Sequence, residues 1–232
     1  MSPIRLLRPS VKRNISLYRR RFLQAKPFKH VVIKNAFNPA LVRRLKDHLE
    51  RESLKRIRNR FHQAHEIVFT QAKSLFVKKW LLAFFQEMIP WVESVTKIKV
   101  TRLWAGLRLF SFEGSDYADT HNDYSWMRAV RVVLFLSDFK PHEGGRLLLL
   151  NSRKGEVIKW IPHRFNTLIL FEVHSRSWHQ VEAIQTNKKR LTASGILFKQ
   201  GCERWFINRL KHLNSRTDKD AKQMKKYFRF PQ

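Results

Sequence analysis

The sequence predicts an α+β protein in which helices come first and a β-sandwich or barrel follows. The first 95 residues hold two patterns with helical spacing, and from about residue 96 short β-rich runs alternate with turns. Of the 232 residues, 43% are hydrophobic and 12% are aromatic, so the chain can bury a full core. The single cysteine, Cys202, excludes an intramolecular disulfide framework and a cysteine-based zinc site.

The two helices are predicted over residues 39–60 and 72–88. The first begins at Asn38, a good N-cap, with Pro39 at the first helical position, and the second ends before Pro90. Each pattern has an apolar stripe with the spacing of one helix face. The stripes are Leu41, Val42, Leu45 and Leu49 in the first helix, and Leu75, Phe76, Trp80, Leu81 and Phe84 in the second.

Short runs rich in β-branched and aromatic residues predict the strands. One run, His30–Lys34, precedes the helices, and the others follow residue 96, with a turn at Gly144-Gly145. Short strands at this spacing are typical of a sandwich or barrel. The later runs are Lys97–Phe112, Ala129–Ser137, Arg146–Leu150, Glu156–Ile161, Thr167–Val173, His179–Ile184 and Arg190–Phe198. A basic helix is expected over residues 203–228.

The charge of the chain is strongly positive and uneven. There are 47 Lys and Arg against 18 Asp and Glu, a formal net charge of +29, and residues 1–46 contain thirteen basic residues and no acid. Residues 1–24 are expected to form a basic arm with partial helical character. Such a field attracts acidic macromolecules, so RNA, ribosomes or an anionic glycan are the expected partners of the basic termini. A host with a basic proteome is the alternative explanation.

Location in the cell is predicted from the ends of the chain and its apolar runs. No apolar run approaches the about 20 residues that a membrane-spanning helix requires, so no transmembrane segment is expected. The arginine- and serine-rich start is similar to a mitochondrial transit peptide. We therefore expect a cytoplasmic protein, with the mitochondrion as the alternative.

One short motif and its downstream context carry the chemistry. His121-Asn122-Asp123 follows a long predicted strand, where a histidine and an aspartate two positions apart can point to one centre. His179 precedes a strand, and Arg190 follows His179 by eleven residues. The order and spacing of these segments resemble those of the iron(II)/2-oxoglutarate-dependent oxygenases, most closely their prolyl-4-hydroxylase-like branch.

The resemblance covers roughly residues 26–200 and implies a fold. The core would be a double-stranded β-helix, or jelly-roll, and the two helices would pack on one of its sheets as a support. The implied division is a basic N-terminal arm at 1–25, a helical support region at 26–95, the Fe(II)/2-oxoglutarate dioxygenase jelly-roll domain at 96–200 and a basic C-terminal helix at 201–232.

The resemblance also implies the metal ligands, which are His121, Asp123 and His179. Two histidines and one carboxylate hold Fe(II) on one side and leave positions open on the other. Three other histidines are expected in loops or at the surface, and of these His174 is the rival for the third ligand because it lies five residues before His179. The three are His142, His163 and His174.

Arg190 is implied to bind the far carboxylate of 2-oxoglutarate with its planar fork. Thr192 and Ser194 share a strand face with Arg190, so one of their hydroxyl groups would donate to the same carboxylate. Tyr117 is a further candidate contact. The prolyl-hydroxylase pattern often has a tyrosine in the strand after the metal loop, where this chain has Leu134-Phe135. The implied cofactors are Fe(II) and 2-oxoglutarate, with ascorbate as a reductant and O₂ as the other reactant.

The implied function is hydroxylation of an unidentified substrate, a prolyl or other protein side chain, with release of succinate and CO₂. The same chemistry on a small molecule, a nucleic acid or a glycan is the first alternative. A non-catalytic basic binding module on this fold is the second. A zinc hydrolase could use the same three ligands but would not need Arg190.

Overall fold

The computed structural model describes residues 4–114 and 116–202, without the side chains of residues 102–106. The helices of this part are α1 (Pro9–Arg13), α2 (Ile15–Gln24), α3 (Pro39–Glu50) and α4 (Leu75–Thr96), with 3₁₀ turns at Phe69–Gln71 and Pro141–Glu143. The strands are β1 (His30–Ile33), β2 (Lys55–Arg58), β3 (His62–Val68), β4 (Val100–Phe112), β5 (Tyr117–His121), β6 (Arg128–Phe135), β7 (Leu147–Leu150), β8 (Val157–Ile161), β9 (Thr167–Glu172), β10 (His179–Val181) and β11 (Arg190–Lys199).

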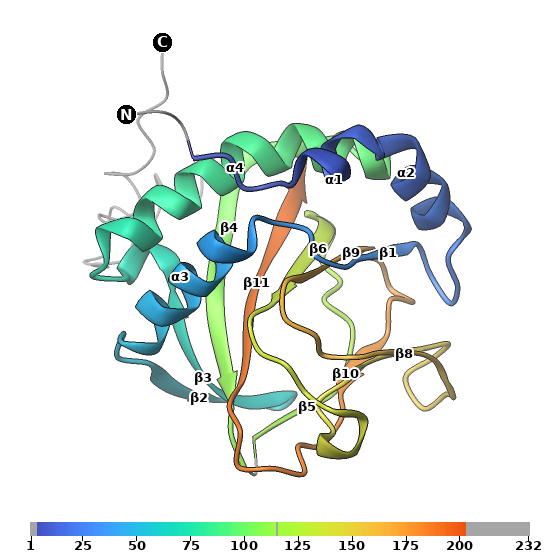
Figure 1. The fold of residues 1–232 in the computed structure, drawn as a ribbon. Coiled ribbons are helices and arrows are strands. Elements are labelled where there is room, and N and C mark those ends of the chain that lie inside the picture. The colour runs from blue at the N-terminus through green and yellow to red at the C-terminus, as the bar shows by residue number, and fades with distance from the viewer. Residues whose placement is uncertain (1–3, 115, 203–232) are drawn as a thin grey trace, which may run out of the picture.

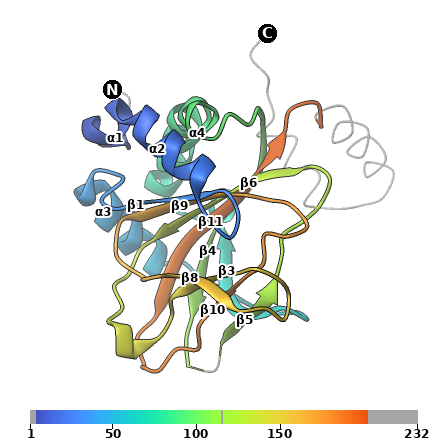
Figure 2. The same ribbon diagram turned by 90° about the vertical axis from the view of Figure 1, so that its right-hand side faces the viewer.

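These strands form one antiparallel sheet that bends into a nearly closed barrel (Figures 1 and 2). The hydrogen-bonded order is β1-β9-β6-β11-β4-β3-β5-β10-β7-β8, and β2 pairs with β3. Side chains from β6 and β9 meet side chains from β7 and β8 inside the barrel. This interior cluster consists of Phe28, Val133, Phe135, Leu147, Leu149, Ile161, Ile169 and Phe171. Two facing walls of antiparallel strands are the arrangement expected of a double-stranded β-helix.

Both faces of the larger wall are buried, because alternate residues of a strand point to opposite faces. In β6, Val133 and Phe135 lie in the barrel interior, whereas Val132 and Leu134 belong to the core beneath the helices. The helices lie together over that outer face (Figure 1). Trp80 of α4 is fully buried there. The helices therefore support the barrel wall, as expected, and leave its interior to other side chains.

Helix α3 begins as predicted but ends ten residues earlier. The Asn38 side chain accepts a hydrogen bond from the Ala40 amide at 3.0 Å, and Pro39 occupies the first turn. The prediction of a helix to residue 60 was wrong, because the apolar stripe ends at Leu49 and residues 55–58 form strand β2. That strand is basic and mostly exposed, as edge strands commonly are.

Helix α4 runs through Pro90, so the predicted end before this residue was also wrong. A proline inside a helix costs about 3 kcal/mol through its missing N–H and its clash with the preceding turn. The turn after Pro90 buries Trp91, Val92 and Val95. Burying such side chains stabilises by roughly 1.5–3 kcal/mol each, which exceeds the cost of the proline. The helix then ends at Lys97, which has a positive φ of 61°.

The N-terminal residues pack on α4 rather than standing away from the fold. Phe22 of α2 is fully buried, as is Leu6 ahead of α1. The Leu6 amide donates to Glu87 Oε2 at 2.6 Å, and Lys12 forms an ion pair with the same glutamate. The basic charge of this stretch therefore lies on helices that share the main core.

The predicted strands after residue 96, and the one at residues 30–34, are confirmed with small shifts of their ends. Three strands were not predicted, namely β2, β3 and β5. The predicted helix over residues 203–228 lies outside the described residues. Within the described residues, no helix combines the length and the apolar character needed to cross a membrane.

Candidate metal and cosubstrate site

Three of the predicted site residues meet where β5 and β10 pair. His121 ends β5 and His179 begins β10, and the two are directly opposite each other, with ring centroids 4.3 Å apart. Asp123 lies two residues beyond β5, and its Oδ2 is 3.5 Å from His179 Nε2. Each of the three residues offers one potential ligand atom, and these atoms all lie within 4.8 Å of one another. Among the described residues this is the one group of three that could hold a metal ion, and we call His121, Asp123 and His179 the metal cluster.

Backbone carbonyl groups determine which nitrogen each histidine presents. His121 Nδ1 lies 2.6 Å from the carbonyl oxygen of Asp119, and His179 Nδ1 lies 3.0 Å from that of Ser177. A carbonyl oxygen can only accept, so each Nδ1 carries the hydrogen and each Nε2 keeps its lone pair. Metal-bound histidines are usually oriented by this kind of contact.

The Asp123 carboxylate is largely buried and stays ionised. Burial raises its pKa, but Arg131, His179, His121 and Arg128 together lower the pKa to about 2. Arg131 Nη1 lies 3.6 Å from Asp123 Oδ2. This Oδ2 is buried without a hydrogen-bond partner, which is unusual for a carboxylate oxygen. An anionic oxygen beside two imidazole lone pairs is a donor set that fits Fe(II).

His179 is buried and remains neutral at neutral pH. Burial and then His121 lower its pKa to about 4, and Asp123 only partly opposes them. The ring packs against Phe171 of the interior cluster, with centroids 4.9 Å apart. A histidine ligand must be unprotonated, so this environment keeps His179 ready to bind a metal ion.

Arg190, the first residue of β11, is 2% exposed and points into the barrel. Its Nε donates to the Gly145 carbonyl at 2.8 Å, its Nη1 donates to Thr192 Oγ1 at 3.0 Å, and its Cζ lies 5.4 Å from the Phe135 ring centroid. Burial lowers its pKa to about 9, and it forms no ion pair with a described residue. Buried guanidinium groups are normally paired, so an anionic ligand fits here.

The predicted turn at Gly144-Gly145 shapes the floor beside Arg190. Both glycines have φ of 71°, a region that other residues rarely adopt. A Cβ on Gly144 would lie 2.0 Å from the Ala183 carbonyl oxygen, and one on Gly145 would lie 3.3 Å from Arg190 Cδ. The two glycines therefore allow the turn to approach β10 and to present a carbonyl to the arginine.

Of the other predicted cosubstrate contacts, Thr192 and Ser194 are buried, whereas Tyr117 is half-buried. Thr192 is buried beside Arg190, and Ser194 is buried but hydrogen-bonds the Val132 carbonyl at 3.3 Å. Tyr117 is half-buried at the start of β5 and alternates with Ala118, whose side chain lies in a small buried cluster with Phe112. Strand alternation therefore points Tyr117 away from that cluster.

The three remaining candidate histidines stay outside the metal cluster. His142 is exposed, and His174 uses Nδ1 to accept the Arg176 amide hydrogen at 3.1 Å. His163 lies in a loop between β8 and β9, as the prediction of a loop or surface position allowed, and it is buried there, with 1% exposed. Burial lowers the pKa of His163 well below its ordinary value, and Arg190 lowers it further.

Two features of the site were not predicted. Arg131 of β6 lies beside Asp123, and nothing in the pattern of that strand distinguishes it from a solvent-facing arginine. Phe61, from the connection between β2 and β3, lies over His121 with ring centroids 6.1 Å apart. Tyr124 and Trp126, which follow the metal motif, are also more than half exposed. Phe61 thus borders the cluster, and the two exposed aromatic residues follow Asp123 closely in the sequence.

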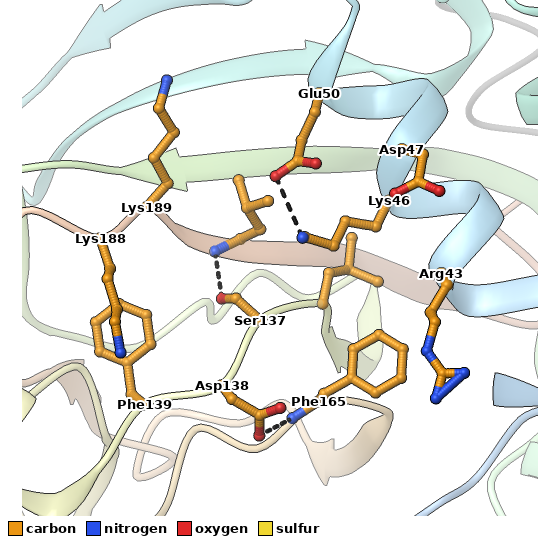
Figure 3. Close-up of a pocket in the computed structure, with 12 residues that line it drawn as sticks. Arg43, Lys46, Asp47, Glu50, Ser137, Asp138, Phe139, Phe165, Lys188 and Lys189 are labelled. Carbon is orange, nitrogen blue, oxygen red and sulfur yellow. Dashed lines mark hydrogen bonds and ion pairs between the residues drawn. The ribbon is translucent and has the colours of Figure 1, made fainter. Parts of the chain in front are cut away.

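A pocket of about 630 Å³ lies elsewhere, between α3 and the segment after β6 (Figure 3). Its walls carry charges of both signs, and Lys46 and Glu50 form an ion pair at 3.5 Å. No metal-cluster residue lines it. The lining residues are Arg43, Lys46, Asp47, Glu50, Leu136, Ser137, Asp138, Phe139, Phe165, Lys188, Lys189 and Leu191.

Comparison with known proteins agrees with this fold and cluster. Residues 107–198 match the family model of the 2OG-Fe(II) oxygenase superfamily. The chain is 26% identical over 183 residues to prolyl 3-hydroxylase OGFOD1 of Xenopus laevis, and 27% identical over 147 residues to prolyl 3-hydroxylase sudestada1 of Drosophila melanogaster. These matches cover 75% and 58% of this chain but only 35% and 27% of the relatives, about a third of their length.

Solved structures share the fold at low identity. A prolyl-4-hydroxylase of Pseudomonas putida superposes with a TM-score of 0.64 at 17% identity, over 79% of this chain and 100% of that one. A Trichoplax adhaerens prolyl hydroxylase, in complex with a hypoxia inducible factor peptide fragment, superposes with a TM-score of 0.66 at 16% identity, over 85% and 95%. The double-stranded β-helix predicted from the sequence is thereby confirmed.

A double-stranded β-helix with a His–Asp–His cluster defines a class of non-haem iron oxygenases. Residues 107–198 are similar in sequence to the 2OG-Fe(II) oxygenase superfamily, and the fold of the chain agrees with that similarity. The curated relatives named above are prolyl 3-hydroxylases, and the solved structures of similar fold include prolyl hydroxylases.

Proposed function

We propose that this chain is an Fe(II)/2-oxoglutarate-dependent dioxygenase that hydroxylates a prolyl or other side chain of a protein. The observation that carries the proposal is the pairing of two features inside one barrel. One is the His–Asp–His cluster, and the other is Arg190, a buried cation without an anionic partner among the described residues. The apolar interior cluster joins them, since Phe171 contacts His179 and Phe135 contacts Arg190.

In this proposal His121, Asp123 and His179 hold Fe(II), and Arg190 binds the distal carboxylate of 2-oxoglutarate. When bound, iron and 2-oxoglutarate supply the oxidation, in which O₂ delivers one oxygen atom to the substrate and one to succinate as CO₂ leaves. The protein keeps Asp123 ionised and His179 neutral, and its apolar interior excludes water from the bound groups. Ascorbate would act from solution by keeping the iron reduced.

A protein substrate is supported by the names of the relatives and by the rim of the site. Two relatives are prolyl 3-hydroxylases, and one structural neighbour is a prolyl hydroxylase bound to a peptide. In this chain the exposed Phe61 lies over His121, and Tyr124 and Trp126, which follow Asp123 in the sequence, are also exposed. Aromatic side chains of this kind contribute strongly to peptide contacts and to packing against a prolyl ring.

Succinate formation tests the activity. We expect purified chain with Fe(II), ascorbate and 2-oxoglutarate to release succinate, and a proline-containing substrate protein to raise the rate and gain one oxygen atom by mass spectrometry. The His179→Ala variant is the control for metal-independent decay of 2-oxoglutarate. Binding of 2-oxoglutarate without succinate, for all substrates offered, would instead favour the non-catalytic module.

We also propose that the N-terminal surface binds an acidic macromolecule such as RNA, with support from the charge alone. Residues 1–46 contain no acid, and within residues 1–24 five arginines are exposed. They are Arg5, Arg8, Arg13, Arg20 and Arg21. Deleting residues 1–24 is unsuitable as a test, because Leu6 and Phe22 belong to the core.

Replacement of the five arginines by glutamine is expected to weaken RNA binding and make it less salt-sensitive. The slope of log affinity against log salt should become shallower by about 0.7 for each lost phosphate contact on a single strand. Electrophoretic or fluorescence titration at several salt concentrations measures this. Replacing the exposed Arg153, Lys154 and Lys159 of the barrel is the matched control. Equal slopes for wild type and the five-fold variant would contradict a contact at this surface.

A further inference from the structure

His163 is a buried polar residue for which the ligand assignments above leave no role. It lies between β8 and β9 and is 1% exposed. Its ring packs on Phe135 with centroids 4.0 Å apart, and on Phe139 with centroids 5.4 Å apart. Its Nε2 lies 3.0 Å from Ser137 Oγ. Its Nδ1 is buried and has no hydrogen-bond partner.

The hydrogen bonds around Ser137 allow His163 to carry its proton on Nδ1. The Leu191 amide donates to Ser137 Oγ at 2.9 Å, a bond that Figure 3 shows as a dashed line at Ser137. The serine hydroxyl hydrogen is therefore available for His163 Nε2. Burial keeps the imidazole neutral, with a single hydrogen. In this tautomer, Nδ1 is a donor that no acceptor among the described residues meets in hydrogen-bond geometry, although the Leu191 backbone interacts with the ring and raises its pKa. Buried donors normally have a well-aligned partner.

Arg190 and His163 share the Phe135 ring as a neighbour. The ring lies 4.0 Å from His163 and 5.4 Å from Arg190 Cζ, and the guanidinium is close enough to lower the pKa of the imidazole. Arg190 uses Nε for Gly145 and one terminal nitrogen for Thr192. A carboxylate on its remaining hydrogens would have about four acceptor positions, more than the arginine fork fills.

We infer that His163 is a second recognition residue for the distal carboxylate of the cosubstrate, donating from Nδ1 to the anion that Arg190 binds. The inference rests on the proposed function. It accounts for both unpaired groups with one ligand, a dicarboxylic 2-oxo acid. Phe135 has no hydroxyl group to offer at this place, whereas the histidine packed on its ring has a spare N–H.

Asparagine and glutamine variants separate the two ring nitrogens. The amide of His163→Asn can replace Nδ1, and the amide of His163→Gln can replace Nε2. We expect His163→Gln to weaken 2-oxoglutarate binding about 10- to 100-fold, the value of one hydrogen bond to a charged group, and His163→Asn to weaken it less. Calorimetry without oxygen, with Mn(II) in place of Fe(II), measures the dissociation constants without relying on turnover.

Two comparisons identify the carboxylate as the contact. Binding of 2-oxopentanoate, which lacks the distal carboxylate, should be the same for wild type and both variants. Adding Phe135→Tyr to His163→Gln should restore part of the lost affinity, because the Phe135 ring is a neighbour of Arg190 and a phenol hydroxyl can donate to the same anion. Equal 2-oxoglutarate constants for wild type and His163→Gln would overturn the inference, as would a larger loss for His163→Asn than for His163→Gln.

Failure of the inference and of the proposed function are distinguishable. If wild type binds 2-oxoglutarate and the variants bind it equally well, only the role of His163 is wrong. If wild type with Mn(II) does not bind 2-oxoglutarate, the proposed function fails and the inference with it. Thermal unfolding and Mn(II) binding without cosubstrate show whether each variant is folded. Should His163→Gln not fold, His163→Ala takes its place, with the same expected loss of 2-oxoglutarate affinity and the same partial recovery when Phe135→Tyr is added.

Discussion

Asp123→Ala is expected to remove Fe(II) binding and with it all succinate formation. The variant loses the one anionic ligand of the cluster and leaves Arg131 beside two histidines without a counter-charge. Loss of a partner that merely orients a ligand costs about 10- to 100-fold in metal affinity, so loss of the ligand itself should exceed about 100-fold. Titration with Mn(II), followed by electron paramagnetic resonance, measures the affinity directly.

Asp119→Ala is the matched control for this prediction. Asp119 lies two residues before His121 on the same strand and its side chain is exposed, while its backbone carbonyl, which orients His121, is kept by the substitution. We expect Asp119→Ala to bind metal as wild type does. If Asp123→Ala bound Mn(II) with unchanged affinity while remaining folded, the cluster would not be the metal site.

Short-range signals in the sequence were sufficient for much of the fold. Asn38 and Pro39 indicate a helix start through capping chemistry that involves only neighbouring residues. The strands after residue 96 are recognisable because turns separate short β-branched runs. The order of His121, Asp123, His179 and Arg190 predicted the residues that the structure brings into one barrel, although they come from three separate segments of the chain.

The misassigned elements depend on contacts that no local pattern contains. Residues 55–58 are basic and lack strand alternation, and they form β2 because β3 offers them a free edge. Helix α4 continues past Pro90 because tertiary packing, which includes Tyr18 of α2 against Trp91, buries the turn that follows. His163 lies in a loop without periodicity, and its burial depends on Phe135 and Phe139 from distant parts of the chain. In each case tertiary packing outweighs the local preference.

The site is electrostatically divided, and this division supports the proposed roles. At the metal cluster, the positive charges of Arg131 and Arg128 oppose the desolvation of a single carboxylate and keep it anionic. At the start of β11, the guanidinium of Arg190 is buried without a carboxylate partner among the described residues. A cation completes the first arrangement and an anion completes the second. A molecule that coordinates a metal at one end and carries a carboxylate at the other satisfies both.

Arg190→Lys is expected to weaken 2-oxoglutarate binding by about 10- to 150-fold, although it conserves the charge. Lysine offers a point charge on a flexible stem and cannot donate to Gly145, Thr192 and a carboxylate with one planar group. A charge-assisted hydrogen bond contributes about 1.5–3 kcal/mol, which corresponds to that range. Calorimetry with Mn(II)-loaded protein measures the constants. Arg146→Lys is the control, since Arg146 is another barrel arginine but pairs with Glu182 at the surface. If Arg190→Lys and wild type bind 2-oxoglutarate equally, the planar fork is not the recognition group, and the unpaired guanidinium requires a different ligand.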